Sequence, residues 1–192
     1  MSSTFRTIFI TIFFTLCFIC STKAQPRVGE FINVSVGYGI SAATDDTSID
    51  GSGFYAQGEY VLALTKWIGI RPYAGVIFTS ATEKDSQPNQ PEYKVTSNAF
   101  LFGGKVRVAA PIPWVAPYIE LGIGATIGSL ETFTPKTNSK GNGLSMHIPF
   151  SIGLVLGPKH NFDVAFMYYI HPSVNQFSGA AAVGFSFPLD AD

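Results

Sequence analysis

Apolar and polar residues alternate along most of the chain beyond residue 30. The pattern is cleanest at 115–128, where the odd positions are apolar and the even positions are mostly small or polar. Successive side chains of a β-strand point to opposite faces, so this alternation predicts a strand with two different faces. A helix would mix the two sets, because its side chains repeat every 3.6 residues.

Eight segments alternate in this way and are predicted to be strands: 32–40, 54–64, 68–79, 99–108, 115–128, 144–156, 162–170 and 179–187. Tight turns and longer loops alternate between them, the turns near 65–67, 109–114 and 157–161 and the loops at 41–51, 80–96, 129–143 and 171–178. The loops therefore gather at one end, which predicts an all-β fold, an eight-stranded antiparallel up-and-down transmembrane β-barrel. Pro149 has no N–H to donate, so a bulge or a missing ladder bond is expected at that position.

The two faces of the predicted strands differ in charge. The mixed face carries six charged residues, three of each sign: Glu59, Arg71, Lys105, Arg107, Glu120 and Asp163. A soluble barrel would need several times more charge on a face that meets water, so this face is predicted to line the bore and the apolar face to meet lipid. The inverted arrangement, with apolar residues around an internal ligand, would make a soluble lipocalin-like carrier.

Five of the six charges lie close to a tight turn and are expected at similar depths in one half of the bore. Buried charges must be paired, so a structural network is predicted in which Glu59 and Glu120 reach Arg71 or Lys105. Such a network could serve as a gate or a proton path. A self-neutralising plug is favoured, because eight strands leave an interior just wide enough for side chains.

Both tryptophans, Trp67 and Trp114, fall at tight turns. Transmembrane barrels carry aromatic girdles where the membrane meets water. The two residues are therefore predicted to be interfacial aromatics at the turn end.

Residues 1–24 have the pattern of a secretory signal peptide. The cation Arg6 precedes an apolar run at 8–19, and a small-residue stretch ends at Ala24. We expect cleavage after Ala24, because the run is shorter than the about 20 residues of a membrane-spanning helix. Cys17 and Cys20 both lie in this segment and neither follows a small residue, so we expect neither lipidation nor a disulfide in the barrel domain, 25–192.

Composition excludes two further classes of protein. The chain of 192 residues is 46% hydrophobic and 13% charged, with 12 Lys and Arg against 13 Asp and Glu. This balance lacks the basic surface of a nucleic-acid-binding protein. Disordered chains are poor in apolar residues, so a folded domain is expected.

Three segments, 31–40, 117–125 and 183–187, resemble the small OmpA/OmpX-type outer-membrane β-barrel family. The resemblance covers all of 25–192 and lies in pattern more than in fixed residues. It implies a monomer in the outer membrane of a Gram-negative-type bacterium, with outer-membrane lipid and the barrel-insertion machinery as partners. Such barrels often end on an aromatic residue, whereas here five residues follow Phe187.

No catalytic, metal or cofactor site is predicted. His171 and Ser173 are similar to the His and Ser of lipid A deacylases, which leaves a small lipid-modifying outer-membrane enzyme as an alternative. However, no acidic residue follows Ser173 before Asp190, and alternation turns His171 inward. Three loop carboxylates, Asp45, Asp46 and Asp50, lack the regular spacing of a Ca²⁺ loop, and His147 is expected to be a hydrogen-bonded filler of the bore.

The function predicted from these patterns is that of an integral outer-membrane barrel with a filled bore and a structural or surface-interaction role. Any partner is expected at the loops 41–51, 80–96 and 129–143, because loops on a rigid scaffold are where binding residues concentrate. These loops hold seven anions and four cations, so a cationic or mixed-charge surface partner is favoured.

Overall fold

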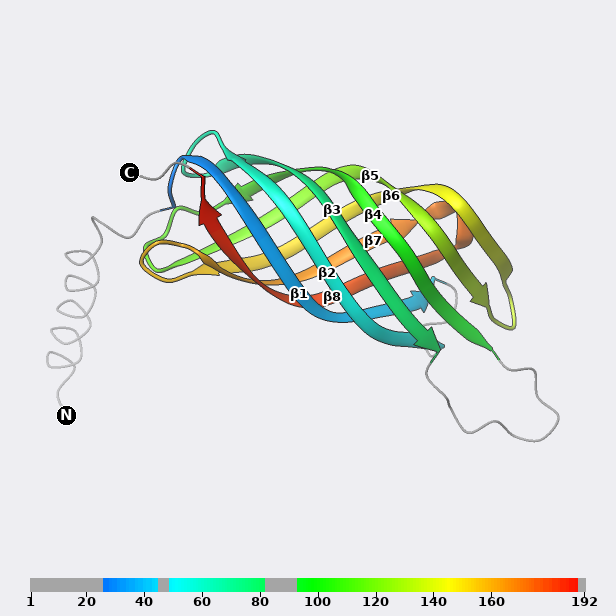
Figure 1. Cartoon of the computed structure of the whole chain (residues 1–192). Coiled ribbons are helices and arrows are strands. Elements are labelled where there is room, and N and C mark those ends of the chain that lie inside the picture. Colours follow the sequence, from blue (N-terminus) through cyan, green and yellow to red (C-terminus); the bar gives the residue numbers. More distant parts are fainter. Residues whose placement is uncertain (1–25, 45–48, 82–92, 190–192) are drawn as a thin grey trace, which may run out of the picture.

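The computed structural model describes residues 26–44, 49–81 and 93–189, in which eight antiparallel strands close into a barrel (Figure 1). Each strand pairs with its neighbours in sequence, and the last pairs with the first. The strands are β1 Gly29–Ala43, β2 Asp50–Ala63, β3 Ile68–Ala81, β4 Lys94–Ala109, β5 Val115–Phe133, β6 Asn138–Leu156, β7 Phe162–His171 and β8 Gln176–Pro188. A 3₁₀ turn, η1, spans Pro172–Val174 between β7 and β8. The expected signal peptide and its cleavage position lie outside the described residues.

The predicted fold class is confirmed, and the largest difference from the sequence prediction is at 129–143. The expected loop is largely a β-hairpin, in which the ladder of β5 and β6 continues from the pair Ser129 and Asn142 to the pair Phe133 and Asn138. Four residues, 134–137, make the turn. The segment alternates little between apolar and polar residues, so periodicity missed strands that backbone pairing forms.

Proline interrupts the ladder at two positions. Between β5 and β6, pairing passes from Leu121 and Phe150 to Gly124 and His147 without a shift in register. The two intervening pairs, one of which includes Pro149, are missing from the ladder. The ladder is therefore interrupted at Pro149, as expected, but the strand does not bulge there. Pro72 marks a similar break between β2 and β3.

The apolar face of every strand lies on the outside of the barrel. Among the exposed large hydrophobic residues, the largest exposed fractions belong to outward-facing residues in the middle of β5 and β6, such as Ile123 at 71% and Leu144 at 70%. Inward-facing residues include buried Ser, Thr, Gln, His and charged side chains. The interpretation as a soluble carrier is therefore wrong, because the apolar residues surround the barrel instead of lining it. No helix in the described part of the chain is long and apolar enough to cross a membrane.

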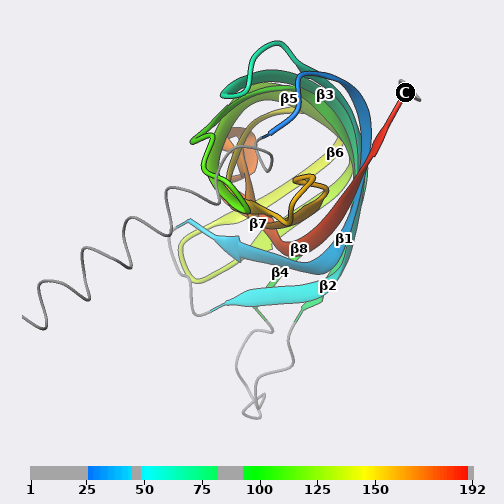
Figure 2. The same ribbon diagram turned by 90° about the vertical axis from the view of Figure 1, so that its left-hand side faces the viewer.

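The two ends of the barrel differ. The end at which β1 begins and β8 ends has three short connections, near 64–67, 110–114 and 157–161, and is called the turn end (left in Figure 1). The opposite loop end carries the long β5–β6 hairpin. Figure 2 shows the turn end, with the strands forming a ring around the interior. Trp67 and Trp114 are both about half exposed at the turn end.

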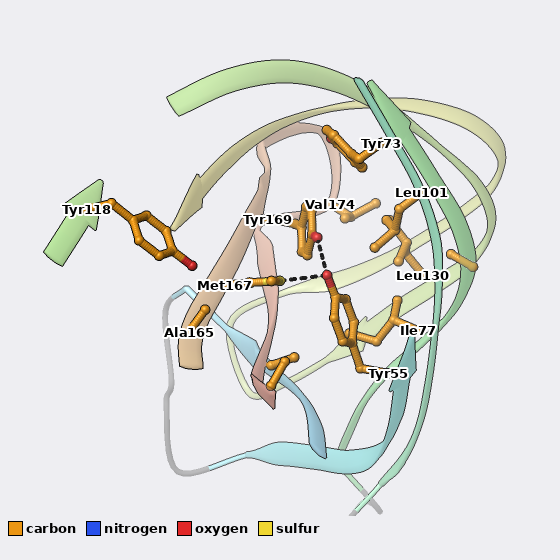
Figure 3. Packing of buried hydrophobic residues seen from close by; sticks show 13 residues of the cluster. Tyr55, Tyr73, Ile77, Leu101, Tyr118, Leu130, Ala165, Met167, Tyr169 and Val174 are labelled. Atoms are coloured by element: carbon orange, nitrogen blue, oxygen red, sulfur yellow. Dashed lines mark hydrogen bonds between the residues drawn. The ribbon is translucent and has the colours of Figure 1, made fainter. Parts of the chain in front are cut away.

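Tyrosine and aliphatic side chains occupy the middle of the interior (Figure 3). The Tyr55 hydroxyl lies 2.8 Å from the Tyr169 hydroxyl and 2.7 Å from the Met167 sulfur. Ile77 and Leu101, both fully buried, belong to the same cluster. The cluster joins strands from opposite sides of the ring.

Inward-facing glycines of β5 leave no room for a side chain beside β4. A Cβ added to Gly122 would overlap the carbonyl group of Gly104 and lie 2.9 Å from the Lys105 Cα. These are backbone atoms, which cannot move aside. A Cβ added to Gly104, which faces outward, would meet nothing within 4 Å.

We therefore expect Gly122→Ala to lower the free energy of unfolding by about 1–3 kcal/mol through overpacking. Gly104→Ala is the matched control and should unfold as the natural chain does. Urea unfolding in lipid vesicles, followed by tryptophan fluorescence, measures both. Equal midpoints for the two variants would contradict the close approach of the strands.

Candidate functional site

The six charged residues of the mixed face all project into the turn-end half of the bore. They come from five strands: Glu59 from β2, Arg71 from β3, Lys105 and Arg107 from β4, Glu120 from β5 and Asp163 from β7. None is more than 8% exposed. Strand register contributes to their meeting, since Arg71 pairs across the ladder with Lys105, and Arg107 with Glu120.

Glu59 is held by two cations. Its Oε2 accepts from Arg71 Nε at 2.5 Å, and its Oε1 accepts from Lys105 Nζ at 2.6 Å. Gln57, two residues away on the same face of β2, also donates to Oε1 at 2.5 Å. The carboxylate is therefore fully engaged although it is buried.

Glu120 contacts three cations. Its Oε1 lies 2.6 Å from Arg107 Nε and 3.4 Å from Arg71 Nε. Its Oε2 lies 2.8 Å from Lys105 Nζ. Arg71 and Lys105 thus bridge the two glutamates, which would otherwise repel each other.

Asp163 joins the network from the other side of the bore. Its Oδ2 accepts from Arg107 Nη1 at 3.0 Å, and its Oδ1 accepts from the Tyr118 hydroxyl at 2.6 Å. The Arg107 guanidinium also stacks on the Tyr118 ring, 3.4 Å from its centroid. The network holds three cations and three anions and is formally neutral.

Hydrogen-bonded tyrosine and histidine side chains lie next to the charged network. The Tyr169 hydroxyl donates to Gln57 Oε1 at 2.5 Å, which connects it through Gln57 to Glu59. The Tyr73 hydroxyl lies 2.5 Å from His147 Nε2. Alternation places Tyr55, Tyr73 and Tyr169 on the inner face, but nothing in the sequence distinguishes them from other inward residues, and it predicts His147 only as a filler of the bore.

Hydroxyl and amide groups fill the loop-end part of the bore. Gln176 Nε2 donates to Ser97 Oγ at 2.5 Å, and Thr132 Oγ1 donates to Gln176 Oε1 at 3.0 Å. The hydroxyls of Ser97 and Ser178 are 2.7 Å apart. All four residues are fully buried. Thus three kinds of side chain succeed one another along the bore: charged, aromatic and hydroxyl-bearing.

His171 and Ser173 do not form the arrangement of a nucleophile and its base. His171 is fully buried and points inward, where its Nε2 lies 2.9 Å from Thr126 Oγ1. Ser173 is exposed, and its hydroxyl lies 2.7 Å from that of Ser145. The two side chains therefore have separate partners, and within the described ranges no carboxylate is bonded to the imidazole.

Among the described residues, no three His, Cys, Asp or Glu side chains gather as a metal site. Of the three carboxylates considered for Ca²⁺, Asp45 and Asp46 lie outside the described residues, and Asp50 is the first residue of β2.

No family model matches the chain, and no curated protein matches it. Solved structures of outer-membrane proteins share its fold, and two of them show the extent of the likeness. Neisserial surface protein A (NspA) has a TM-score of 0.56 and 11% sequence identity, over 84% of this chain and 97% of that chain. The outer membrane protein OprG from Pseudomonas aeruginosa has a TM-score of 0.51 and 11% identity, over 87% of this chain and 100% of that chain.

At this level of identity the likeness is one of fold. The chain has the eight-stranded architecture of small outer-membrane barrels of the OmpA/OmpX type. The resemblance read from the sequence is confirmed in that respect.

The charged network yields a prediction about stability. Glu120→Gln leaves three buried cations facing two carboxylates, and breaking a buried pair costs about 3–5 kcal/mol. We expect a shift of that size in the free energy of unfolding in urea, measured in lipid vesicles.

Glu131→Gln at the loop end is the matched control. Its carboxylate is partly exposed and lies 3.1 Å from Lys94 Nζ, so its loss should cost about 0–1 kcal/mol. If Glu120→Gln shifted stability no more than this control, the network would be solvated and weak.

Proposed function

We propose that this chain is an integral protein of the outer membrane of a Gram-negative-type bacterium and that it acts as a rigid, plugged scaffold for its loop end. The apolar exterior supports a location in lipid, since outward-facing residues along the strands are large and hydrophobic. Export by the signal peptide at 1–24 and insertion by the barrel-insertion machinery are part of the same proposal.

The observation that carries the proposal is the neutral ion-pair network across the bore. Lys105 and Arg71 each contact carboxylates from two other strands, so the side chains bridge the interior instead of lining its wall. The tyrosine and hydroxyl groups beyond them are buried as well. A continuous water-filled path would require these contacts to open. The arrangement therefore supports a structural role for the bore instead of transport.

The β5–β6 hairpin supports a role for the loop end. Its inward side is buried, with Leu130 packed in the interior cluster and Thr132 bonded to Gln176. Its outward side carries Lys140, whose Nζ lies 3.7 Å from Glu131 Oε1, and Lys136 is exposed in its turn. A paired hairpin with a fixed base and a charged tip is suited to contact another molecule at the surface.

The partner proposed for this end is a surface of mixed charge. The described hairpin brings more cations than anions, while most of the acidic residues expected at 41–51 and 80–96 lie outside the described residues. A partner that met the whole loop end would therefore face both signs. The lipid-modifying enzyme is the weaker candidate, because His171 and Ser173 have separate partners.

The plug makes a prediction about ion flux. In planar bilayers we expect the natural chain to give no lasting conductance. Replacing Lys105, Glu120, Tyr169 and Gln176 together with Ala removes one neutral ion pair and one large side chain from each of the other two layers of the bore, and should produce ion flux. Tyr168→Ala, on the outward face beside Tyr169, is the control and should stay silent. A natural chain that conducts as well as the multiple variant would contradict the plug.

The orientation can be tested with epitope tags. A tag inserted after Lys136, at the exposed tip of the hairpin, should bind antibody on intact cells, because exposed loop tips tolerate insertions. A tag inserted after Ile112 in a turn-end connection should bind only after the outer membrane is permeabilised. The reverse result would invert the proposed orientation. If neither tag could be detected in the outer-membrane fraction, the proposed location would be contradicted.

A further inference from the structure

A cavity of about 90 Å³ lies in the bore at the turn end, and Arg71 and Arg107 of the ion-pair network form part of its wall. Its wall includes inward-facing residues such as Val61, Gly69 and Ala116, together with Trp67 and residues of two turns. Its volume is on the order of several water molecules. A small polyatomic ion fits this space. Because the wall is made of inward-facing residues, the ion would enter from the turn end of the bore and not through the wall of the barrel.

The lining of this cavity is basic. Its charged members are Arg27, Lys66, Arg71, Arg107 and Lys159, and His160 is also present. No Asp or Glu belongs to the lining among the described residues. The network cations Arg71, Lys105 and Arg107 are balanced by Glu59, Glu120 and Asp163, so the exposed cations Arg27 and Lys159 add positive charge at the mouth.

Arg71 supplies a second, independent observation. The residue is only 3% exposed, and its Nε is used on Glu59 and Glu120. Its Nη2 is buried and has no hydrogen-bond partner among the described residues. A buried guanidinium nitrogen without an acceptor is costly, so the site is incomplete as it stands.

We propose that this cavity binds a small oxyanion of the phosphate class. Guanidinium groups present donors in a planar fork that matches phosphate oxygens, and the anion would give Arg71 Nη2 an acceptor. The rim cations Arg27 and Lys159 attract it and complete its neutralisation. The inference does not depend on the proposed function, because it concerns the opposite end of the barrel from the hairpin.

Trp67 provides a direct probe, because it lines the cavity and the chain has only one other tryptophan. The full-length sequence, expressed and processed in cells and carrying Trp114→Phe, would be purified in uncharged dodecyl maltoside micelles. Titration with inorganic phosphate should change Trp67 fluorescence saturably. Sodium chloride at equal ionic strength should not, and an equal response to chloride would reduce the effect to screening and overturn the proposal.

Rim variants locate the binding. Arg27→Gln combined with Lys159→Gln removes two exposed cations of the mouth and should weaken phosphate binding roughly tenfold or more, as expected for charged hydrogen-bonding partners. Lys136→Gln, an exposed lysine at the loop end, is the control and should bind as before. Unchanged affinity in the double variant would overturn the assignment. Because both rim residues are exposed, this test does not depend on an intact buried network.

Arg71→Lys tests the buried donor. It keeps a cation beside Glu59 but removes Nη2, so phosphate binding should be lost while heat-modifiable mobility on a gel still reports a folded barrel. Folded protein with natural affinity would overturn the role of Arg71, and if the variant fails to fold the rim variants decide.

The phosphate group could be free or belong to a lipid headgroup. Short-chain phosphatidylglycerol added to the micelles separates these sources. Competition with inorganic phosphate assigns the site to a headgroup, and unchanged phosphate affinity assigns it to a free anion. Both outcomes support the same chemistry in the cavity, whereas the absence of any saturable phosphate response would overturn it.

Discussion

The bore of an eight-stranded barrel is just wide enough for side chains, and this width constrains every inward position of the chain. Water cannot satisfy polar groups there as it would on a surface, so the side chains must satisfy one another. In the turn-end half, three cations and three carboxylates do so across five strands. Arg107 shows the requirement most clearly, since it pairs with Glu120 on the neighbouring strand and with Asp163 on a strand across the bore.

The same width explains why glycine and bulky residues face each other inside. A Cβ on Gly153 would lie 2.5 Å from the Tyr118 hydroxyl oxygen, which is the oxygen that donates to Asp163. On β5, the space beside Gly124 is occupied by the Tyr73 hydroxyl and the His147 ring. Gly153 and Gly124 are the ladder partners of Tyr118 and His147 on the neighbouring strand. Each large side chain therefore reaches its hydrogen-bond partner only because a glycine lies beside it at that level. The packing of the bore and the pairing of its polar groups therefore depend on each other.

Alternation along the strands is enough to predict which face a residue occupies, and all six bore charges lie on the face that it indicates. It could not predict partners that lie across the bore, such as Arg107 and Asp163, because these depend on the stagger of the closed sheet as well as on facing. It also missed the hairpin beyond Ser129, where Glu131 and Lys140 lie opposite each other in a ladder without an apolar stripe. The basic turn-end cavity could not be predicted for a third reason. Arg27 and Lys159 are far apart in the sequence, and only the closed barrel brings both to the lining of one cavity.

An apolar filling of equal volume would stabilise a bore at least as well as buried ion pairs do. It would, however, leave both faces of each strand apolar, and nothing would then distinguish inside from outside. With the charges present, a slip of one residue turns Lys105, Arg107 and Glu120 toward lipid. That exposure costs about 2–4 kcal/mol for a cation at the bilayer midplane, and less toward the interfaces. The charges must also balance, because an unpaired charge inside is costly as well. A neutral network thus fixes the register of the strands that carry it. The register in turn places the β5–β6 hairpin at the loop end of the closed barrel and the basic cavity at the turn end.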